Sequence, residues 1–463
     1  MAQGSAIRAA FSGIGFHLLA GLILVVPALM NHAPLVYSDS GTYITTSRSL
    51  LPPIDRPIGY ALIMRAVTWQ STLWTVVFFQ GMVASWLIQR TIVTLFPGLQ
   101  GNWRAHVSTL AVLLAISSLP WYASQLMPDV FSGLLALCVF LLLFGRRLGR
   151  VELALLWTML FFFAITHYSH LVMLLLVGAG SLVAFGGRLA KRWKMPGRRA
   201  VLTGLILAPV LGILFAMGYN ARHGHGFKLS PTSSLFLAGK LIESGVMHTY
   251  LSKRCDERPY FLCTHLDELN TTGMRYVWDE KAPTRQGLGM VEASARLDPL
   301  VRDILTDPAM WPMLAWTSAL ATAIQFTQID IGSGIHAYGA HSAPWWPISH
   351  EYKHELPMYM DSIQQRDSWG FAFLNVVHMW LMLAACLIVV VLWPSRRSAR
   401  WWGFVALMTA FALANAAATG ALANVYDRLQ SRVTWLLILA ALMLLAHAHA
   451  PVRRMLSFAP RGR

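Results

Sequence analysis

Ten apolar segments, most of them close to twenty residues long, constrain this chain more than any other feature of its sequence. A helix rises about 1.5 Å per residue, so about 20 apolar residues cross the ~30 Å hydrocarbon core of a membrane. Of the 463 residues, 56% are hydrophobic and only 13% are charged. This composition is unlike that of a soluble enzyme and predicts an all-α, polytopic membrane protein with about ten transmembrane helices. The expected spans are 9–30, 72–96, 106–120, 129–145, 151–166, 170–187, 200–219, 371–393, 401–423 and 433–449.

These segments divide the chain into three regions. Residues 1–219 hold the first transmembrane helices, and residues 371–463 hold the last ones and a basic tail. Between them, residues 220–370 form a long polar segment, expected to be of mixed secondary structure, with 16 of the 21 acidic residues. Its moderately apolar stretch, 310–328, is expected to be an interfacial or re-entrant helix. If this stretch crossed the membrane, the basic residues at 396–400 would lie outside, against the preference of Lys and Arg for the cytoplasmic side.

The charged residues indicate how the chain is oriented. If Met1 is cytoplasmic, the segments on that side carry 19 Lys or Arg residues and a single acid, Glu152. Cytoplasmic loops are enriched in Lys and Arg, so both termini are expected in the cytoplasm and 220–370 outside. The net charge of +16 is then a signal of topology and not of a nucleic-acid partner. The abundance of Ala, Arg and Leu favours a GC-rich bacterium, and the expected location is then its inner (plasma) membrane.

Acidic residues stand at the outer ends of two expected spans. Asp39 follows the first span within Ser-Asp-Ser-Gly-Thr-Tyr, and Asp129 opens the fourth span after Met-Pro. A carboxylate at the membrane surface is costly to desolvate and usually has a partner. It can take a proton from a hydroxyl group or hold a divalent cation. The alternative is structural: Asp39 suits a helix N-cap or a turn, and Asp129 suits a helix start, where it complements the helix dipole.

Basic residues and histidines lie at the same outer ends. Arg56 is in the first outer loop, and Arg428 and Arg432 stand at the start of the last span, four residues apart and therefore on one helix face. Arginine can bind a phosphate through two hydrogen bonds; snorkelling to lipid headgroups is the alternative. His167 and His170 share a very short outer loop, where they are either phosphate or metal contacts or structural residues of the interface.

The cysteines and the missing motifs narrow the range of functions. Cys255 and Cys263, eight residues apart in the outer segment, are expected to form a local disulfide, with two free thiols as the alternative. The sequence has no P-loop, no dinucleotide-binding glycine pattern and no CxxC. The expected cytoplasmic loops are too short for a nucleotide-binding domain. These features argue against an ATP-driven pump and against an enzyme that uses a nucleotide sugar in the cytoplasm.

Together, these motifs resemble the GT-C superfamily of polytopic membrane glycosyltransferases, which includes polyprenyl-phosphate-sugar-dependent aminoarabinose and mannosyl transferases. The matching pieces are Asp39 after the first span, Arg-Pro-x-Gly-Tyr-x-Leu from Arg56 to Leu62, Met-Pro-Asp ending at Asp129, the polar turn 167–170, and Asp-Arg before the last span. By layout, the resemblance covers about 1–190 and 400–450. The acid pair that the family carries in its first loop is absent, since Asp39 stands between two serines.

The resemblance implies an inverting glycosyltransferase that moves a sugar from a polyprenyl-phosphate donor to a lipid or glycan acceptor at the outer face. The implied site residues are Asp39 as the base or metal carboxylate, Asp129 as its partner, and Arg56, Arg428, Arg432, His167 and His170 as contacts of the donor phosphate. The resemblance fixes no cofactor, and a divalent metal ion is the one that the carboxylates could hold. Two other classes stay open: a secondary transporter, and a lipid-linked polysaccharide polymerase, ligase or assembly protein, which would need the arginines but not Asp39.

Overall fold

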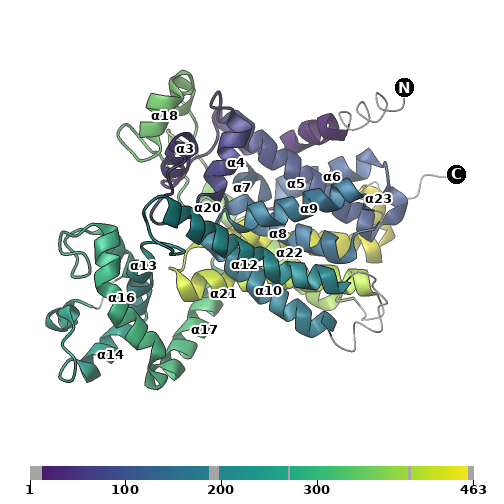
Figure 1. Cartoon of the computed structure of the whole chain (residues 1–463). Coiled ribbons are helices and arrows are strands. Elements are labelled where there is room, and N and C mark those ends of the chain that lie inside the picture. The colour runs from purple at the N-terminus through teal and green to yellow at the C-terminus, as the bar shows by residue number, and fades with distance from the viewer. Residues whose placement is uncertain (1–12, 147, 187–197, 270–271, 395–397, 457–463) are drawn as a thin grey trace.

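A computed structural model describes residues 13–456 except 147, 187–197, 270–271 and 395–397 (Figure 1). In the described residues, regular structure is helical, and bridge pairing is limited to one isolated bridge between Leu35 and Gln125. The all-helical class expected from the sequence is confirmed, and six of the described helices are long and apolar enough to cross a membrane. These six are Gly13–Asn31, which includes η1 (Leu22–Val25) and α2 (Val26–Asn31), then α5 (Trp74–Leu95), α12 (Arg198–Arg222), α20 (Phe371–Val391), α21 (Ala399–Leu422) and α22 (Asp427–Ala448).

The other four expected spans coincide with helices of 14 to 19 residues. They are α6 (Trp103–Ile116), α8 (Asp129–Phe144), α9 (Arg150–Ala164) and α10 (Tyr168–Gly186). Short helices join or cap the bundle: α3 (Ser40–Ser49), α4 (Gly59–Thr68), η2 (Pro97–Leu99), α7 (Leu119–Ala123) and α23 (Ala450–Met455). The helix positions therefore follow the apolar pattern of the sequence, while the count of ten spans stays a prediction.

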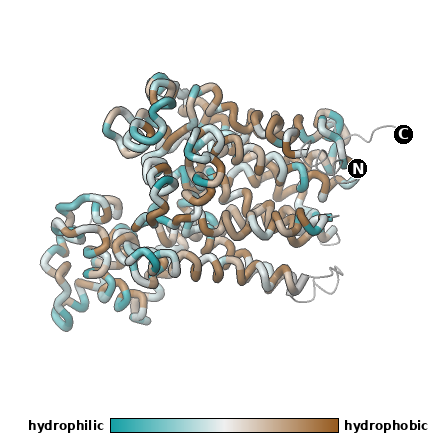
Figure 2. Tube along the Cα trace, turned by 45° about the horizontal axis from the view of Figure 1, so that its top comes forward, coloured by the Kyte–Doolittle hydropathy of each residue, from teal (hydrophilic) through white to brown (hydrophobic). Residues whose placement is uncertain are grey.

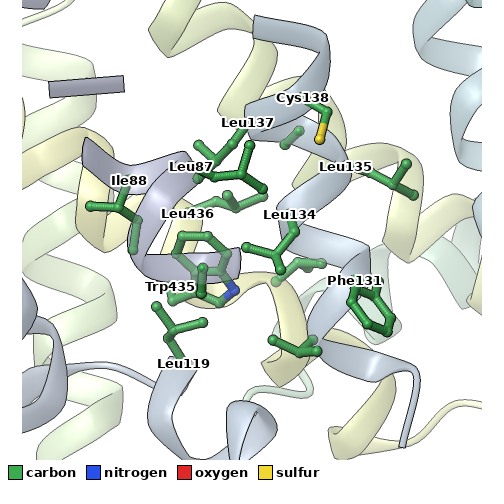
Figure 3. Close-up of a cluster of buried hydrophobic side chains, with 14 of the residues drawn as sticks. Leu87, Ile88, Leu119, Phe131, Leu134, Leu135, Leu137, Cys138, Trp435 and Leu436 are labelled. Carbon is green, nitrogen blue, oxygen red and sulfur yellow. The ribbon is translucent and has the colours of Figure 1, made fainter. Parts of the chain in front are cut away.

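Helix α8 lies at the centre of the bundle, and each of its 16 residues is buried. Helices α5, α21 and α22 pack against it. Figure 3 shows Trp435 and Leu436 of α22 beside Leu134 of α8. Gly133 allows this close approach, because a Cβ at that position would lie 2.5 Å from the indole ring of Trp435. Helices in membranes commonly approach each other at such small residues.

The two ends of the bundle differ in character. Figure 2 shows apolar residues along the helices and hydrophilic residues concentrated beyond one end, where the polar segment lies. The first described residues and α23 lie at the opposite end (Figure 1). In α9, Glu152, the one acid expected on the basic side, pairs with Arg90 of α5 over 3.2 Å. The structure thus separates 220–370 from the described chain ends, in the way that the charge pattern predicts, whereas the identity of each side stays a prediction.

The polar segment forms two lobes at one end of the bundle, and its described residues are helices, turns and loops rather than the expected mixed structure. The first lobe, 223–310 without 270–271, has its own apolar core. It contains α13 (Ser233–Glu243), α14 (Val246–Arg254), η3 (Phe261–Glu268), α15 (Gly273–Trp278), α16 (Met290–Thr306) and η4 (Pro308–Met310). A disulfide joins Cys255, after α14, to Cys263 in η3, which is the pairing that their spacing predicts.

The second lobe, 328–370, contains α18 (Trp345–Glu351), η5 (Lys353–Glu355) and α19 (Leu356–Met360), and it packs on α3. Between the lobes, the stretch expected to be interfacial forms α17 (Trp311–Thr327). One face of α17 packs on α21 near Gly420, while Trp316, Leu320 and Ile324 stay exposed. An exposed apolar stripe opposite a packed face is consistent with a helix beside the membrane.

Candidate functional site: a carboxylate–arginine cluster under the lobes

Asp39 lies at the lobe-bearing end of the bundle, immediately before α3. Its backbone occupies the N-cap position, yet its side chain makes no capping hydrogen bond. Instead, its Oδ1 lies 3.2 Å from Nη1 of Arg56, and its Oδ2 lies 3.5 Å from Nη1 of Arg428. The side chain of Asp39 therefore pairs with two arginines from other parts of the chain and does not cap its own helix.

Arg56 is held in place by its neighbour in the sequence. Its Nε and Nη2 donate to the two carboxylate oxygens of Asp55 over 3.1 and 2.6 Å. The guanidinium also lies over the ring of Tyr43, 5.4 Å from its centroid. This bidentate pairing fixes the plane of the guanidinium and leaves Nη1 directed at Asp39.

Arg428 lies between the two acids that the sequence singled out. Its Nη1 is 3.5 Å from Oδ2 of Asp39 and 3.8 Å from Oδ2 of Asp129. Its guanidinium lies over the ring of Tyr37, 4.0 Å from the centroid, which is a favourable place for a cation. Since one nitrogen contacts both carboxylates, Asp39 and Asp129 belong to a single cluster.

Arg432 and Asp129 form the inner part of this cluster. Nη1 of Arg432 donates to Oδ1 of Asp129 over 2.9 Å. The other donors of Arg432 bind Oδ1 of Asn415, over 3.1 and 2.9 Å, and Oγ of Ser169, over 2.8 Å. The side chains of Arg432 and Asp129 are 0% and 1% exposed. Arg432 thus holds Asp129 inside the bundle, and the geometry gives no support to its expected contact with a donor phosphate.

The rest of the cluster is more open. We call Asp39, Arg56 and Arg428 the outer trio and Asp129 with Arg432 the inner pair. The side chain of Asp39 is 26% exposed, and those of the two trio arginines are 12% and 13% exposed. The contacts within the trio exceed the 2.7–2.9 Å that is typical of tight charge-assisted hydrogen bonds. The outer trio is therefore the part of the cluster that can exchange partners with a ligand.

The two predicted histidines play different parts. His170 is fully buried, and its Nδ1 and Nε2 are hydrogen-bonded to the Phe163 carbonyl, over 2.8 Å, and to Oγ of Ser132, over 2.7 Å. With both ring nitrogens paired, His170 is a core residue, and its expected contact with a phosphate has no support here. His167 is half-buried, and its Nδ1 accepts hydrogen bonds from the backbone N–H and the hydroxyl of Ser169. In the neutral ring the proton is then on Nε2, which can donate to a ligand.

The charges around Asp39 set its ionisation. Burial on its own would raise the pKa of Asp39, but the positive charges of Arg56 and Arg428 outweigh it, so the net pKa lies below the usual range of an aspartate. Counting Asp55, the cluster holds three acids and three arginines and is close to neutral overall. Asp39 is therefore an ionised carboxylate whose counter-charges both come from the outer trio.

The carboxylates are not arranged as a metal site. Among the residues that the structure describes, no group of three or more His, Cys, Asp or Glu side chains is placed to hold a metal ion. The nitrogen of Arg428 occupies the place between Asp39 and Asp129 where a bridging cation would have to lie. The arrangement thus supplies positive charge through arginine.

Four members of the site were not predicted from the sequence. Asp55 and Tyr37 support the outer trio, and Ser169 and Asn415 hold Arg432. Asn415 could have been noticed as a polar residue inside an apolar span, because such residues are rare there and usually have a partner. Tyr37 lies in a loop and Ser169 in the first turn of α10, both in stretches of ordinary composition that carry no such signal.

The fold and the site together define a helical protein with candidate membrane spans and a neutral carboxylate–arginine cluster beneath two lobes. Comparisons with protein-family models, with curated proteins and with solved structures found no match for this chain. We therefore infer a function from the chemistry of the cluster and from the motifs of the sequence.

Proposed function

We propose that this chain is an integral membrane glycosyltransferase that moves a sugar from a polyprenyl-phosphate donor to a lipid or glycan acceptor. The observation that carries the proposal is the outer trio: a partly exposed, ionised carboxylate between two arginines, at the end of an apolar bundle and under two polar lobes. A polyprenyl-phosphate sugar has matching parts, since its chain suits apolar helices and its phosphate suits the arginines. Its phosphate is also the leaving group, so a nucleotide-binding fold is not required.

The trio can change partners when the donor binds. A phosphodiester brings one negative charge, which competes with Asp39 for Arg56 and Arg428. As the arginines turn to the phosphate, the charges that lower the pKa of Asp39 move away, and its carboxylate becomes a stronger base. The donor thereby prepares the base that its own transfer requires. His167 can add a neutral hydrogen-bond donor through Nε2.

The proposed reaction balances in charge. The oxygen of an acceptor hydroxyl forms a bond to the anomeric carbon and gives its proton to Asp39. The bond from the anomeric carbon to the phosphate oxygen breaks, and its electron pair stays with the phosphate, which leaves as a monoester with one more negative charge. Protonation of Asp39 leaves the cluster with one more positive charge, which stabilises that product. The configuration at the anomeric carbon inverts, because the attack is a single displacement.

The inner pair has a supporting role in this proposal. Asp129 is too deeply buried to reach a substrate directly, but its Oδ2 has no hydrogen-bond donor and lies 3.8 Å from Arg428. Its charge holds Arg428 at the position where the donor phosphate would have to bind. Arg432 in turn fixes Asp129, so that the pair positions Arg428 rather than taking part in the displacement.

The proposal also includes the topology. We place the lobes outside an inner bacterial membrane and both termini in the cytoplasm, with about ten spans. The support is the separation of 220–370 from the described chain ends and the basic residues of the loops at the other end. A polyprenyl-phosphate sugar displayed at the outer face would then meet the outer trio at the level of the headgroups.

The experiment is a transfer assay on the full chain in proteoliposomes that contain labelled undecaprenyl-phosphate mannose, glucose or aminoarabinose with a membrane-lipid extract as the acceptor source. Release of undecaprenyl phosphate measures transfer. Asp39→Asn keeps the shape but removes the base, and we expect the rate to fall by about 10²–10⁴. Asp361→Asn is the matched control, since Asp361 is an exposed lobe acid that pairs only with Arg366 among the described contacts. No release with any donor, or full activity in Asp39→Asn, contradicts the proposal and favours the polymerase, ligase or transporter classes.

A further inference from the structure

An exposed cluster of aromatic rings lies on the second lobe, around the first turn of α18. Trp345 and Trp346 contact each other edge to face, with ring centroids 5.2 Å apart. The ring of His341 lies 5.1 and 5.4 Å from these two indoles, and the ring of His350 lies 5.2 Å from Trp346. Trp346 is 47% exposed, whereas Trp345 packs partly on the core of the bundle. We call His341, Trp345, Trp346 and His350 the aromatic platform.

The platform is fixed next to the outer trio because α18 and α3 pack side by side in the same direction. At their first turns, the backbone of Ala343 and Pro344 lies so close to Gly41 that a Cβ there would be 2.1 Å from the Ala343 carbonyl oxygen. At their last turns, Arg48 of α3 pairs with Glu351 of α18 over 3.3 Å. Since α3 begins directly after Asp39, the first turn of α18 is held beside the turn that carries Asp39.

The loop that leads into α18 adds to this attachment. Gly334 packs directly against the ring of Tyr37, and Tyr338, whose hydroxyl donates to the Gly334 carbonyl over 2.9 Å, also contacts Ser38. His341, further along the loop, has a φ of 69°, a conformation that is unusual for a residue with a Cβ. The chain thus holds an imidazole beside two indoles at a conformational cost, which is a feature of ligand-contacting segments.

We propose that the aromatic platform binds a pyranose ring of the acceptor, which makes the acceptor a glycan or a glycolipid with its sugar exposed. This inference rests on the proposed function and names its acceptor class. Indole faces attract the C–H groups of a sugar ring, and the polar edges of the platform can bind its hydroxyl groups. Nδ1 of His350 donates to the Trp346 carbonyl over 2.8 Å, so its exposed Nε2 is an acceptor for a sugar hydroxyl.

The position favours a sugar over a lipid chain. In the sequence, the polar and charged residues Ser349, Glu351, Lys353 and His354 adjoin the platform, whereas the exposed stripe of α17 is apolar. A sugar on the platform would also lie beside the turn of Asp39, which needs an acceptor hydroxyl close by. An acyl chain carries no hydroxyl group that Asp39 could deprotonate.

The test is direct sugar binding to the full chain in nanodiscs, which does not depend on transfer. Tryptophan fluorescence is titrated with the soluble oligosaccharides mannotetraose, chitotetraose and maltotetraose, and with sorbitol as a non-ring control. We expect a saturable change with at least one of the three oligosaccharides, weakened about tenfold by Trp346→Ala and by His350→Ala and partly restored by Trp346→Phe. Trp69→Ala is the matched control, because Trp69, directly after α4, is 86% exposed and outside the platform.

Two results would overturn the inference. One is the absence of a saturable change with any of the three oligosaccharides, or a change that Trp346→Ala leaves intact. The other is quenching of Trp346 by lipids brominated along their acyl chains, measured as the difference between the wild-type chain and Trp346→Phe, since a sugar platform must lie outside the hydrocarbon. If sugar binding is found but undecaprenyl phosphate is never released, the platform stands and the proposed transfer reaction fails.

Discussion

Arg432 donates to Asp129 over 2.9 Å inside the bundle, although 303 residues separate them in the sequence. Both side chains are almost completely buried, so neither charge has water to replace its partner. Removal of one member of such a pair leaves an uncompensated charge, which typically costs about 3–5 kcal/mol. The pair therefore ties the start of α8 to the second turn of α22.

The first prediction concerns the contribution of the inner pair to the stability of the chain. Asp129→Asn or Arg432→Met alone should strongly destabilise the chain, whereas the double variant should lose less than the sum of the two. The loss of stability is measured by thermal unfolding in detergent, which is monitored through the reaction of a thiol-reactive dye with the buried Cys138. Additive losses in the double variant would mean that the two residues do not stabilise each other.

The second prediction concerns Arg428. Arg428→Gln removes a charge-assisted contact from the site proposed for the donor phosphate, so the KM for the donor should rise about ten- to a hundredfold. Binding of undecaprenyl phosphate, measured by native mass spectrometry, should weaken in parallel. Arg366→Gln is the control, because Arg366 is an exposed lobe arginine. Equal donor KM values in the two variants would remove Arg428 from the phosphate site.

The third prediction is a pH dependence. Because the pKa of Asp39 is below the usual range of an aspartate, its carboxylate stays ionised at acidic pH values at which an ordinary aspartate takes up a proton. The stability that it contributes is present above the pKa of the unfolded chain and is lost as the pH falls through the lower, folded pKa. In Arg428→Gln one of the two positive charges that lower the pKa of Asp39 is gone, so this pKa should rise. The acid limb in the pH dependence of kcat/KM should therefore move to higher pH. An unchanged acid limb would show that Arg428 does not set the ionisation of Asp39.

The fourth prediction concerns metal ions. Since Arg428 already stands between Asp39 and Asp129, transfer should persist within about twofold after treatment with EDTA, because arginine supplies the charge that a metal would otherwise supply. Loss of activity that Mg²⁺ or Mn²⁺ restores would contradict this and would return the two acids to the role of metal ligands.

The sequence predicted which residues come together better than it predicted what each of them contacts. Arg428 and Arg432 were expected to act alike, because residues four apart share a helix face. Both do face the cluster, but four residues of helix correspond to a depth of about 6 Å. That depth places Arg432 among fully buried partners and leaves Arg428 partly exposed, so only one of them can meet a ligand.

Long-range partners were beyond the reach of sequence patterns. Local composition marks Asp39 and Asp129 as acids at helix starts, but it carries no information about the arginines that neutralise them. The structural alternatives for Asp39 were a capping bond and a turn; Asp39 does lie in a turn before α3, but its side chain makes no capping bond and pairs with Arg56 and Arg428. His170 shows the converse case: a short loop of polar residues suggested a ligand contact, but Ser132 of α8 binds its Nε2 and the Phe163 carbonyl of α9 accepts from its Nδ1.

The most direct test of the central claim is a cryo-electron microscopy map of the chain in nanodiscs with undecaprenyl phosphate bound. We expect the phosphate between the guanidinium groups of Arg56 and Arg428, within about 3 Å of each, with the carboxylate of Asp39 released from both. A phosphate bound at the opposite end of the bundle, near Arg90 and Glu152, or an outer trio unchanged by the bound lipid, would contradict it.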